Sequence, residues 1–205
     1  MRFVKMLTEP EPRERFLSNQ EKTNLFEVLR DNNQLLAIVL IGLTTGWRKG
    51  QILSVKKQDL DCANQAVTII KSKRNPARKI IVPDFIWRIF QCLADEAKSE
   101  WLFYNEKTGK RLGDSKTAWR TALRRAGIEG LHFHDIRHTF ATELFDLGGR
   151  EFTVQTALGH SDIKTTRGYT HVRNEVLRQQ LNELGNRQDF NDYSISKSGK
   201  KGFTD

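Results

Sequence analysis

The sequence predicts an α+β fold that is mainly helical and contains a small three-stranded antiparallel sheet. Several apolar stretches of helical length are preceded by a capping Ser or Asp and followed by Gly, which predicts the helices. Between residues 53 and 83, short β-branched or apolar runs alternate with turn residues, which predicts the sheet. A chain of 205 residues, 38% of them hydrophobic, is long enough to bury the core of one such domain.

A polar segment precedes the first predicted helix. Residues 1–17 are charged and hold two of the four prolines, so we interpret them as a linker and place the folded domain at residues 18–185. Ser18 and Glu21 have the spacing of a capping box, in which each side chain accepts a hydrogen bond from the other residue's backbone N–H. A helix to about Arg30 is expected to follow.

Four longer helices are expected further along the chain. The first is almost wholly apolar and is expected to form the centre of the core, and glycines can end it and two of the others. They are predicted at residues 35–43, 84–97, 114–126 and 134–147. Two short helices are expected on either side of Gly159, and the polar residues 186–205 are expected to form a flexible tail.

The predicted strands lie at residues 53–55, 66–70 and 80–82. Each run is short and bounded by turn residues, and the Asn75-Pro76 pair marks the turn between the second strand and the third. Five cations and no acid fall within the nine residues 71–79. The hairpin is therefore expected to be strongly basic.

The charge balance favours an anionic partner. Lys and Arg number 34 against 25 Asp and Glu, which gives a formal net charge of +9, and nucleic acid is the first such partner to consider. No apolar run approaches the roughly 20 residues that cross a bilayer, and the N-terminus opens no signal peptide, so we expect a cytoplasmic protein with no membrane contact. Cys62 and Cys92 form no CxxC motif, so neither a disulfide framework nor a thiolate metal site is expected.

Four side chains in the C-terminal half have the chemistry to act on a phosphate. His134 and Arg137 are three positions apart and therefore share one face of a helix, where an imidazole and a guanidinium suit a phosphate group. A glycine can end a helix just before His160, which would place this histidine at a corner. Tyr169 follows nine residues later. Taken singly, each residue has an ordinary interpretation as a packing or surface residue.

Together these motifs resemble the catalytic domain of the tyrosine recombinases, the phage integrase family. The resemblance covers about residues 16–178. It rests on three motifs in order: Thr45-Gly46-Trp47-Arg48, the run His134-Asp135-Ile136-Arg137-His138-Thr139-Phe140-Ala141-Thr142, and Leu158-Gly159-His160 followed by Tyr169. It implies a site-specific DNA recombinase or integrase that cleaves and rejoins duplex DNA through a 3′-phosphotyrosyl intermediate, with neither a metal nor ATP as cofactor.

The resemblance implies catalytic roles for five of these residues. Arg48 and Arg137 would clamp the non-bridging oxygens of the scissile phosphate and stabilise the charge of the transition state. Tyr169 would attack phosphorus. A free tyrosine has a pKa of about 10, so its attack needs nearby positive charge or a base. His134 would assist proton transfer around the nucleophile, and His160 would hydrogen-bond a phosphate oxygen.

A sixth role belongs in this family to a lysine on the β-hairpin, which protonates the departing 5′-hydroxyl. Lys73 fits this role best, because Ser72-Lys73 leads into the turn. Lys71 is the alternative. In the non-catalytic interpretation, the basic hairpin only contacts the DNA backbone and neither lysine acts as an acid.

One position departs from the family pattern. Three residues after the first arginine, where the family usually has an acid, this chain has Gln51. A carboxylate would orient Arg48, whereas glutamine can accept a hydrogen bond but brings no charge. Asp135, which can support a neighbouring side chain, does match.

The resemblance also implies partners. Family members clamp double-stranded DNA between an N-terminal core-binding domain and this one, and only 17 linker-like residues come before Ser18, so we expect an isolated catalytic domain. We expect a monomer in solution and a homotetramer in a DNA synapse, with residues after about Arg173 forming an exchanged helix. Accessory DNA-bending proteins are further expected partners.

Three alternatives remain open. A type IB topoisomerase would use similar chemistry to relax supercoils. A non-catalytic DNA-binding remnant of an integrase is suggested by Gln51. A zinc site is suggested by the i, i+4 spacing of His134 and His138, but the glutamate of HExxH is absent and Arg137 would repel a cation there.

Overall fold

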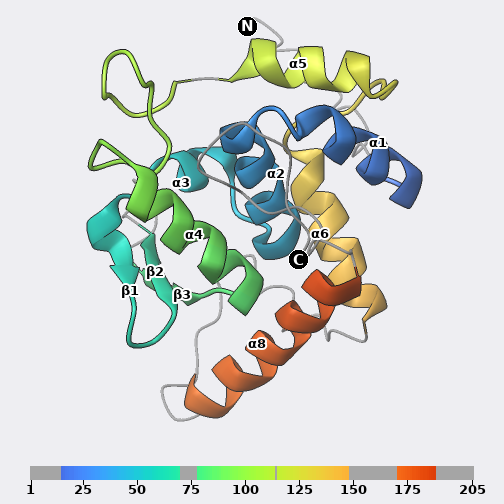
Figure 1. Cartoon of the computed structure of the whole chain (residues 1–205). Coiled ribbons are helices and arrows are strands. Elements are labelled where there is room, and N and C mark those ends of the chain that lie inside the picture. The colour runs from blue at the N-terminus through green and yellow to red at the C-terminus, as the bar shows by residue number, and fades with distance from the viewer. Residues whose placement is uncertain (1–14, 70–77, 114, 148–169, 188–205) are drawn as a thin grey trace, which may run out of the picture.

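The computed structural model describes residues 15–69, 78–113, 115–147 and 170–187, and the fold is drawn from these residues (Figure 1). They form a mainly helical domain with one small sheet, which confirms the predicted α+β class. The α-helices are α1 (Asn19–Leu29), α2 (Asn33–Thr45), α3 (Lys49–Leu53), α4 (Asp84–Glu96), α5 (Lys116–Arg125), α6 (Asp135–Asp146) and α8 (Thr170–Arg187). The strands are β1 (Leu60–Asp61), β2 (Ala66–Ile69) and β3 (Arg78–Ile81), and a 3-10 turn at Lys57–Asp59 precedes β1.

Helix α2 is the centre of the core, as its apolar sequence predicts. Every residue from Leu35 to Thr45 is buried. Figure 1 shows α2 in the middle of the domain, with α4 and the sheet on one side and α6 on the other. The helix ends at Gly46, whose left-handed φ of 66° is strain-free only for a residue without Cβ. The end of α2 is therefore fixed by its own sequence.

Helices α2 and α6 approach each other closely at Gly42. A Cβ atom at this position would lie 3.0 Å from Cγ2 of Ile136, so only glycine fits without a shift of α6. Ile136 itself is 1% exposed and belongs to the same core. This close approach brings the start of α6 next to the end of α2.

Helix α1 begins as its capping box predicts. The Ser18 hydroxyl accepts a hydrogen bond of 3.2 Å from the backbone N–H of Glu21, and the Glu21 carboxylate accepts one of 2.9 Å from the backbone N–H of Ser18. Just before this cap, the backbone N–H of Leu17 donates to the Thr139 hydroxyl at 2.9 Å, which ties the entry of the domain to α6.

The sheet has the order β1-β2-β3 and is antiparallel throughout, as predicted. The position predicted for its first strand, residues 53–55, is wrong. Leu53 is the last residue of α3, and the strand that pairs with β2 is Leu60–Asp61. The side chains of Leu53 and Val55 are buried in the core, and two buried apolar residues so close together fit a helix end as well as a strand.

Helix α8 packs against α6 through a small apolar cluster of its own. The cluster consists of Phe140, Leu144, Leu177, Leu181 and Leu184. Polar contacts fix the other side of α8: Arg178 donates to the carbonyl of Asn64 at 2.9 Å, and Asn182 exchanges two hydrogen bonds with Asp84 at the start of α4. The C-terminal helix is therefore held on its own chain at both the sheet and α4.

Candidate active site

Arg48 lies at the corner between α2 and α3. It is the N-cap of α3, with extended backbone angles, and its side chain is exposed. Its backbone N–H donates a hydrogen bond of 2.9 Å to Oε1 of Gln51. The amide oxygen at the position where an acid is usual in the family therefore caps the short helix that carries Arg48, without adding charge.

Arg137 comes from the first turn of α6 and is only 7% exposed. Its Nη1 donates a hydrogen bond of 2.7 Å to the backbone carbonyl of Gly46. A buried guanidinium requires such acceptors, and this one belongs to the residue that ends α2. The close approach at Gly42 makes the bond possible, because it places α6 against this end of α2.

His134 is the N-cap residue of α6, so the helix begins one residue later than predicted. Its ring meets the His138 ring edge to face, with centroids 5.2 Å apart. Partial burial, followed by the charges of His138, Arg137 and Arg48, lowers the pKa of His134 from its ordinary 6.5, while Asp135 opposes the shift. At neutral pH the imidazole is therefore uncharged and able to accept a proton.

Asp135 supports the backbone next to this histidine. The residue is 5% exposed, and its carboxylate accepts a hydrogen bond of 2.7 Å from the backbone N–H of His132. The carboxylate thus fixes the turn that leads into His134. Its negative charge sits at the positive end of the α6 dipole, where it stabilises the helix.

The three described candidates line one small pocket of about 140 Å³. Its lining residues are Trp47, Arg48, Lys49, Phe133, His134 and Arg137. Within the described residues, this lining has three basic side chains, two Arg and one Lys, and no carboxylate. Since the volume is several times the roughly 30 Å³ that a water molecule occupies in the liquid, the pocket can accept a small anionic group such as a phosphate.

The other candidates lie outside the described residues. These are Lys73 and its alternative Lys71, His160 and Tyr169. The structure does describe the elements on either side of them, since β2 and β3 flank the hairpin and α8 begins at Thr170, next to the tyrosine. The two short helices expected around Gly159 also fall outside the described residues.

Two residues of the pocket, Lys49 and Phe133, were not predicted as site residues from the sequence. The ammonium of Lys49 lies over the Phe133 ring, with Nζ 5.5 Å from the centroid. The Phe133 ring in turn meets Trp119 of α5 edge to face, with centroids 5.3 Å apart. The only signal in the sequence was that Lys49 and Phe133 each adjoin a predicted site residue.

Within the described part of the chain, no group of three or more His, Cys, Asp or Glu side chains is placed to hold a metal ion. Within the same residues, no helix has the length and apolar character needed to cross a membrane.

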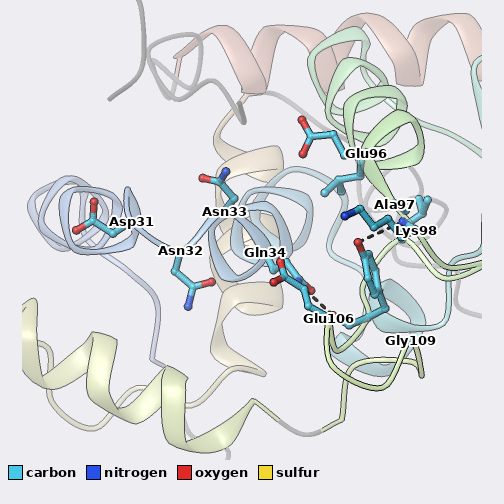
Figure 2. Close-up of a pocket in the computed structure, with 12 residues that line it drawn as sticks. Asp31, Asn32, Asn33, Gln34, Glu96, Ala97, Lys98, Glu106 and Gly109 are labelled. Carbon is cyan, nitrogen blue, oxygen red and sulfur yellow. Dashed lines mark hydrogen bonds between the residues drawn. The ribbon is translucent and has the colours of Figure 1, made fainter. Parts of the chain in front are cut away.

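A second, larger pocket of about 840 Å³ lies between the α1–α2 turn, the end of α4 and the loop at residues 102–109 (Figure 2). Two hydrogen bonds hold its wall: Gln34 donates to the carbonyl of Tyr104 at 3.1 Å, and the backbone N–H of Lys98 donates to the Tyr104 hydroxyl at 3.2 Å. Its charged lining residues are Asp31, Glu96, Lys98 and Glu106. This excess of acids does not suit a phosphate, and none of the three site residues that the structure describes lines this pocket.

The chain is similar in sequence to one known protein family and to curated members of it. The model of the phage integrase family matches residues 15–175. The integrase of Salmonella phage P22 is 29% identical over 192 residues, which cover 85% of this chain and 49% of that protein. The chain thus spans about half the length of this curated relative.

Two solved structures share the fold. The integrase from mycobacterium phage Brujita superposes with a TM-score of 0.66 at 23% identity, over 84% of this chain and 60% of that one. The XerH site-specific recombinase bound to a palindromic difH substrate superposes with a TM-score of 0.57 at 27% identity, over 81% of this chain and 52% of that one.

Proposed function

Because the chain belongs to the phage integrase family, we propose that it is the catalytic domain of a site-specific recombinase that cleaves and rejoins duplex DNA through a 3′-phosphotyrosyl intermediate. The observation that carries this proposal is the pocket that joins Arg48, His134 and Arg137, with no carboxylate among its described lining residues. A phosphodiester is the anion that these three side chains suit together. The reaction needs neither a metal ion nor ATP.

The two arginines bind the scissile phosphate. Each guanidinium offers paired N–H groups that match two phosphate oxygens, and attack on phosphorus adds negative charge to those oxygens. Because the Gly46 carbonyl already holds Arg137, this side chain needs little reordering as the transition state forms. The arginines thus stabilise the transition state more than the ground state.

The nucleophile is Tyr169. Its phenolic oxygen forms a bond to phosphorus, the bond from phosphorus to the 5′-oxygen breaks, and Lys73 gives its proton to that oxygen. His134, uncharged at neutral pH, assists removal of the tyrosine proton, and His160 donates a hydrogen bond to a phosphate oxygen. The phosphotyrosyl bond conserves the energy of the broken bond, so attack by a 5′-hydroxyl reverses the step.

Double-stranded DNA is the proposed partner, and the XerH structure with its difH substrate supports this assignment. The net charge of +9 favours DNA binding. The proposed location is the cytoplasm, and accessory DNA-bending proteins are proposed as further partners. Packing of α8 on its own chain supports a monomer in solution, and a homotetramer would form on DNA by exchange of α8. The proposed catalytic unit is residues 18–185, with a linker before it and a tail after it.

The proposal is tested by covalent trapping on a nicked duplex whose base pairs are randomised on both sides of the nick. Cleavage next to the nick releases a short strand, so rejoining fails and the protein stays attached to DNA. The unmutated chain is expected to give a slow-migrating band on a denaturing gel, and Tyr169→Phe none. A band of equal intensity from Tyr169→Phe, or none from an unmutated chain that binds the duplex, would overturn the proposal.

A further inference from the structure

We propose that Lys49 binds the same phosphate as Arg48 and Arg137 and is a further substrate-binding residue of this pocket. The inference rests on the proposed function, since it assumes that a DNA phosphate occupies the pocket. Its structural basis lies wholly in described residues: Lys49 lines the pocket and is half-buried there.

The ammonium of Lys49 is held at the pocket by an aromatic contact. Its Nζ lies 5.5 Å from the centroid of the Phe133 ring, and that ring also contacts Trp119 edge to face. The negative face of an aromatic ring attracts a cation but does not neutralise it. The contact therefore restrains the flexible stem of Lys49 and holds its ammonium at the pocket.

The charges around Lys49 favour an anion. Arg48 precedes it in the chain and Arg137 lines the same pocket, so three cations share about 140 Å³. None of the described residues that line this pocket carries a carboxylate. Like charges in one pocket repel each other, and a phosphate relieves this repulsion by contacting all three.

Lys56 has a similar aromatic contact at a different place in the fold. Its ammonium lies 4.3 Å from the centroid of the Trp101 ring, in the same kind of cation–π contact. Glu100 pairs with it at 2.9 Å, and Lys56 is not among the residues that line the small pocket. The two lysines thus share an aromatic contact but differ in whether they face the pocket, which makes Lys56 a matched control.

The first test measures binding without cleavage. Lys49→Ala and Lys56→Ala are made in the Tyr169→Phe chain, and each lowers the net charge by one. Affinity for a randomised duplex is measured over a range of salt concentrations. Lys49→Ala is expected to reduce the log-log salt slope by about 0.9, the value for one lost phosphate contact, and Lys56→Ala is expected to leave it unchanged.

The second test measures covalent product formed in a single turnover on the nicked duplex. Lys49→Ala is expected to slow this step at least about tenfold, which is the loss expected for one hydrogen bond to a charged group, and Lys49→Arg is expected to restore most of the rate. Thermal melts of each variant confirm that it is folded, and Lys49→Gln replaces Lys49→Ala if the latter is unstable.

The inference requires both effects. If Lys49→Ala and Lys56→Ala have the same salt slope, or the same cleavage rate, the role proposed for Lys49 is wrong. This holds even if Tyr169→Phe abolishes the covalent product as proposed. If the unmutated chain forms no covalent product, the proposed function fails, and the salt slope alone then decides whether Lys49 contacts phosphate.

Discussion

The guanidinium of Arg137 donates a hydrogen bond of 2.7 Å to the backbone carbonyl of Gly46, which lies 91 positions earlier in the chain. Gly46 is the left-handed residue that ends α2, and Arg48 lies two positions beyond it. One arginine therefore fixes the turn that carries the other. The two proposed phosphate-binding groups are coupled through a single backbone atom.

This coupling predicts that lysine cannot replace arginine at position 137. A lysine there would keep the charge but lose the planar fork that reaches the Gly46 carbonyl and a phosphate together. Arg137→Lys is expected to slow covalent product formation about 100-fold, as loss of a transition-state donor does. DNA affinity is expected to change little. Single-turnover trapping measures the rate, and Arg88→Lys, at an exposed position of α4, is the control.

The contact between Gly42 and Ile136 predicts an effect on both stability and activity. In Gly42→Ala the new Cβ would meet Cγ2 of Ile136 at 3.0 Å, so α6 must shift away from α2. We expect a loss of about 1–3 kcal/mol in the free energy of unfolding, measured by urea denaturation, together with slower cleavage.

Gly50→Ala is the matched control for that variant. Among the described residues, nothing lies within 4 Å of a Cβ built at Gly50, which is part of helix α3. This substitution is expected to stabilise the protein by about 0.4–1 kcal/mol, because alanine restricts the unfolded chain. Equal stability changes in the two variants would contradict the account of how α6 is positioned.

Local signals explain which parts of the fold could be predicted from sequence. The capping box at Ser18 and the glycine at the end of α2 are contacts between near neighbours, so they can be recognised in the sequence itself. Residues 53–55 carry no such end signal, and the strand predicted there proved to be the end of α3 and the residues after it.

The site also has a part that could be predicted from the sequence and a part that could not. The motifs predict that Arg48, His134 and Arg137 act together, and the structure places them around one pocket. Lys49 and Phe133 could not be predicted as its members, because they meet only where α2 and α6 approach each other. That approach is a tertiary contact, and no local pattern encodes it.

The lowered pKa of His134 predicts the pH dependence of cleavage. The rate is expected to be level above the ordinary pKa of 6.5 and to fall only at lower pH, as the imidazole gains a proton. Burial is the main cause of the shift, and the charge of His138 is the next. His138→Gln is therefore expected to move the acidic limb of the pH–rate profile to higher pH. His132→Gln, which removes none of the contributing charges, serves as the control.

The same shift has a consequence for stability. The folded state binds a proton on His134 less readily than the unfolded state does, so stability attributable to this group is present above pH 6.5 and is lost as the pH falls through the lowered pKa. Denaturation curves measured across this pH range are expected to show that His134→Gln loses less free energy of unfolding at low pH than the unmutated chain does. An unchanged loss would show that other groups govern acid sensitivity.

The hydrogen bond made by Gln51 predicts how much the absence of an acid at this position affects cleavage. Because its amide oxygen caps the backbone N–H of Arg48, Gln51→Glu keeps the cap, and we expect less than about a tenfold change in cleavage. Gln51→Ala removes the cap and is expected to cost about 0.5–2 kcal/mol in stability. A larger gain in cleavage by Gln51→Glu would mean that a negative charge beside the Arg48 guanidinium is needed.

The most direct measurement is to identify the residue that becomes attached to DNA. The chain has three tyrosines, Tyr104, Tyr169 and Tyr193, and the trapped complex can be digested with a protease and a nuclease and analysed by mass spectrometry. The account predicts that the nucleotide mass is found only on the peptide that contains Tyr169, and that Arg137→Lys gives far less of it. A nucleotide on Tyr104, on Tyr193 or on a residue other than tyrosine would contradict it.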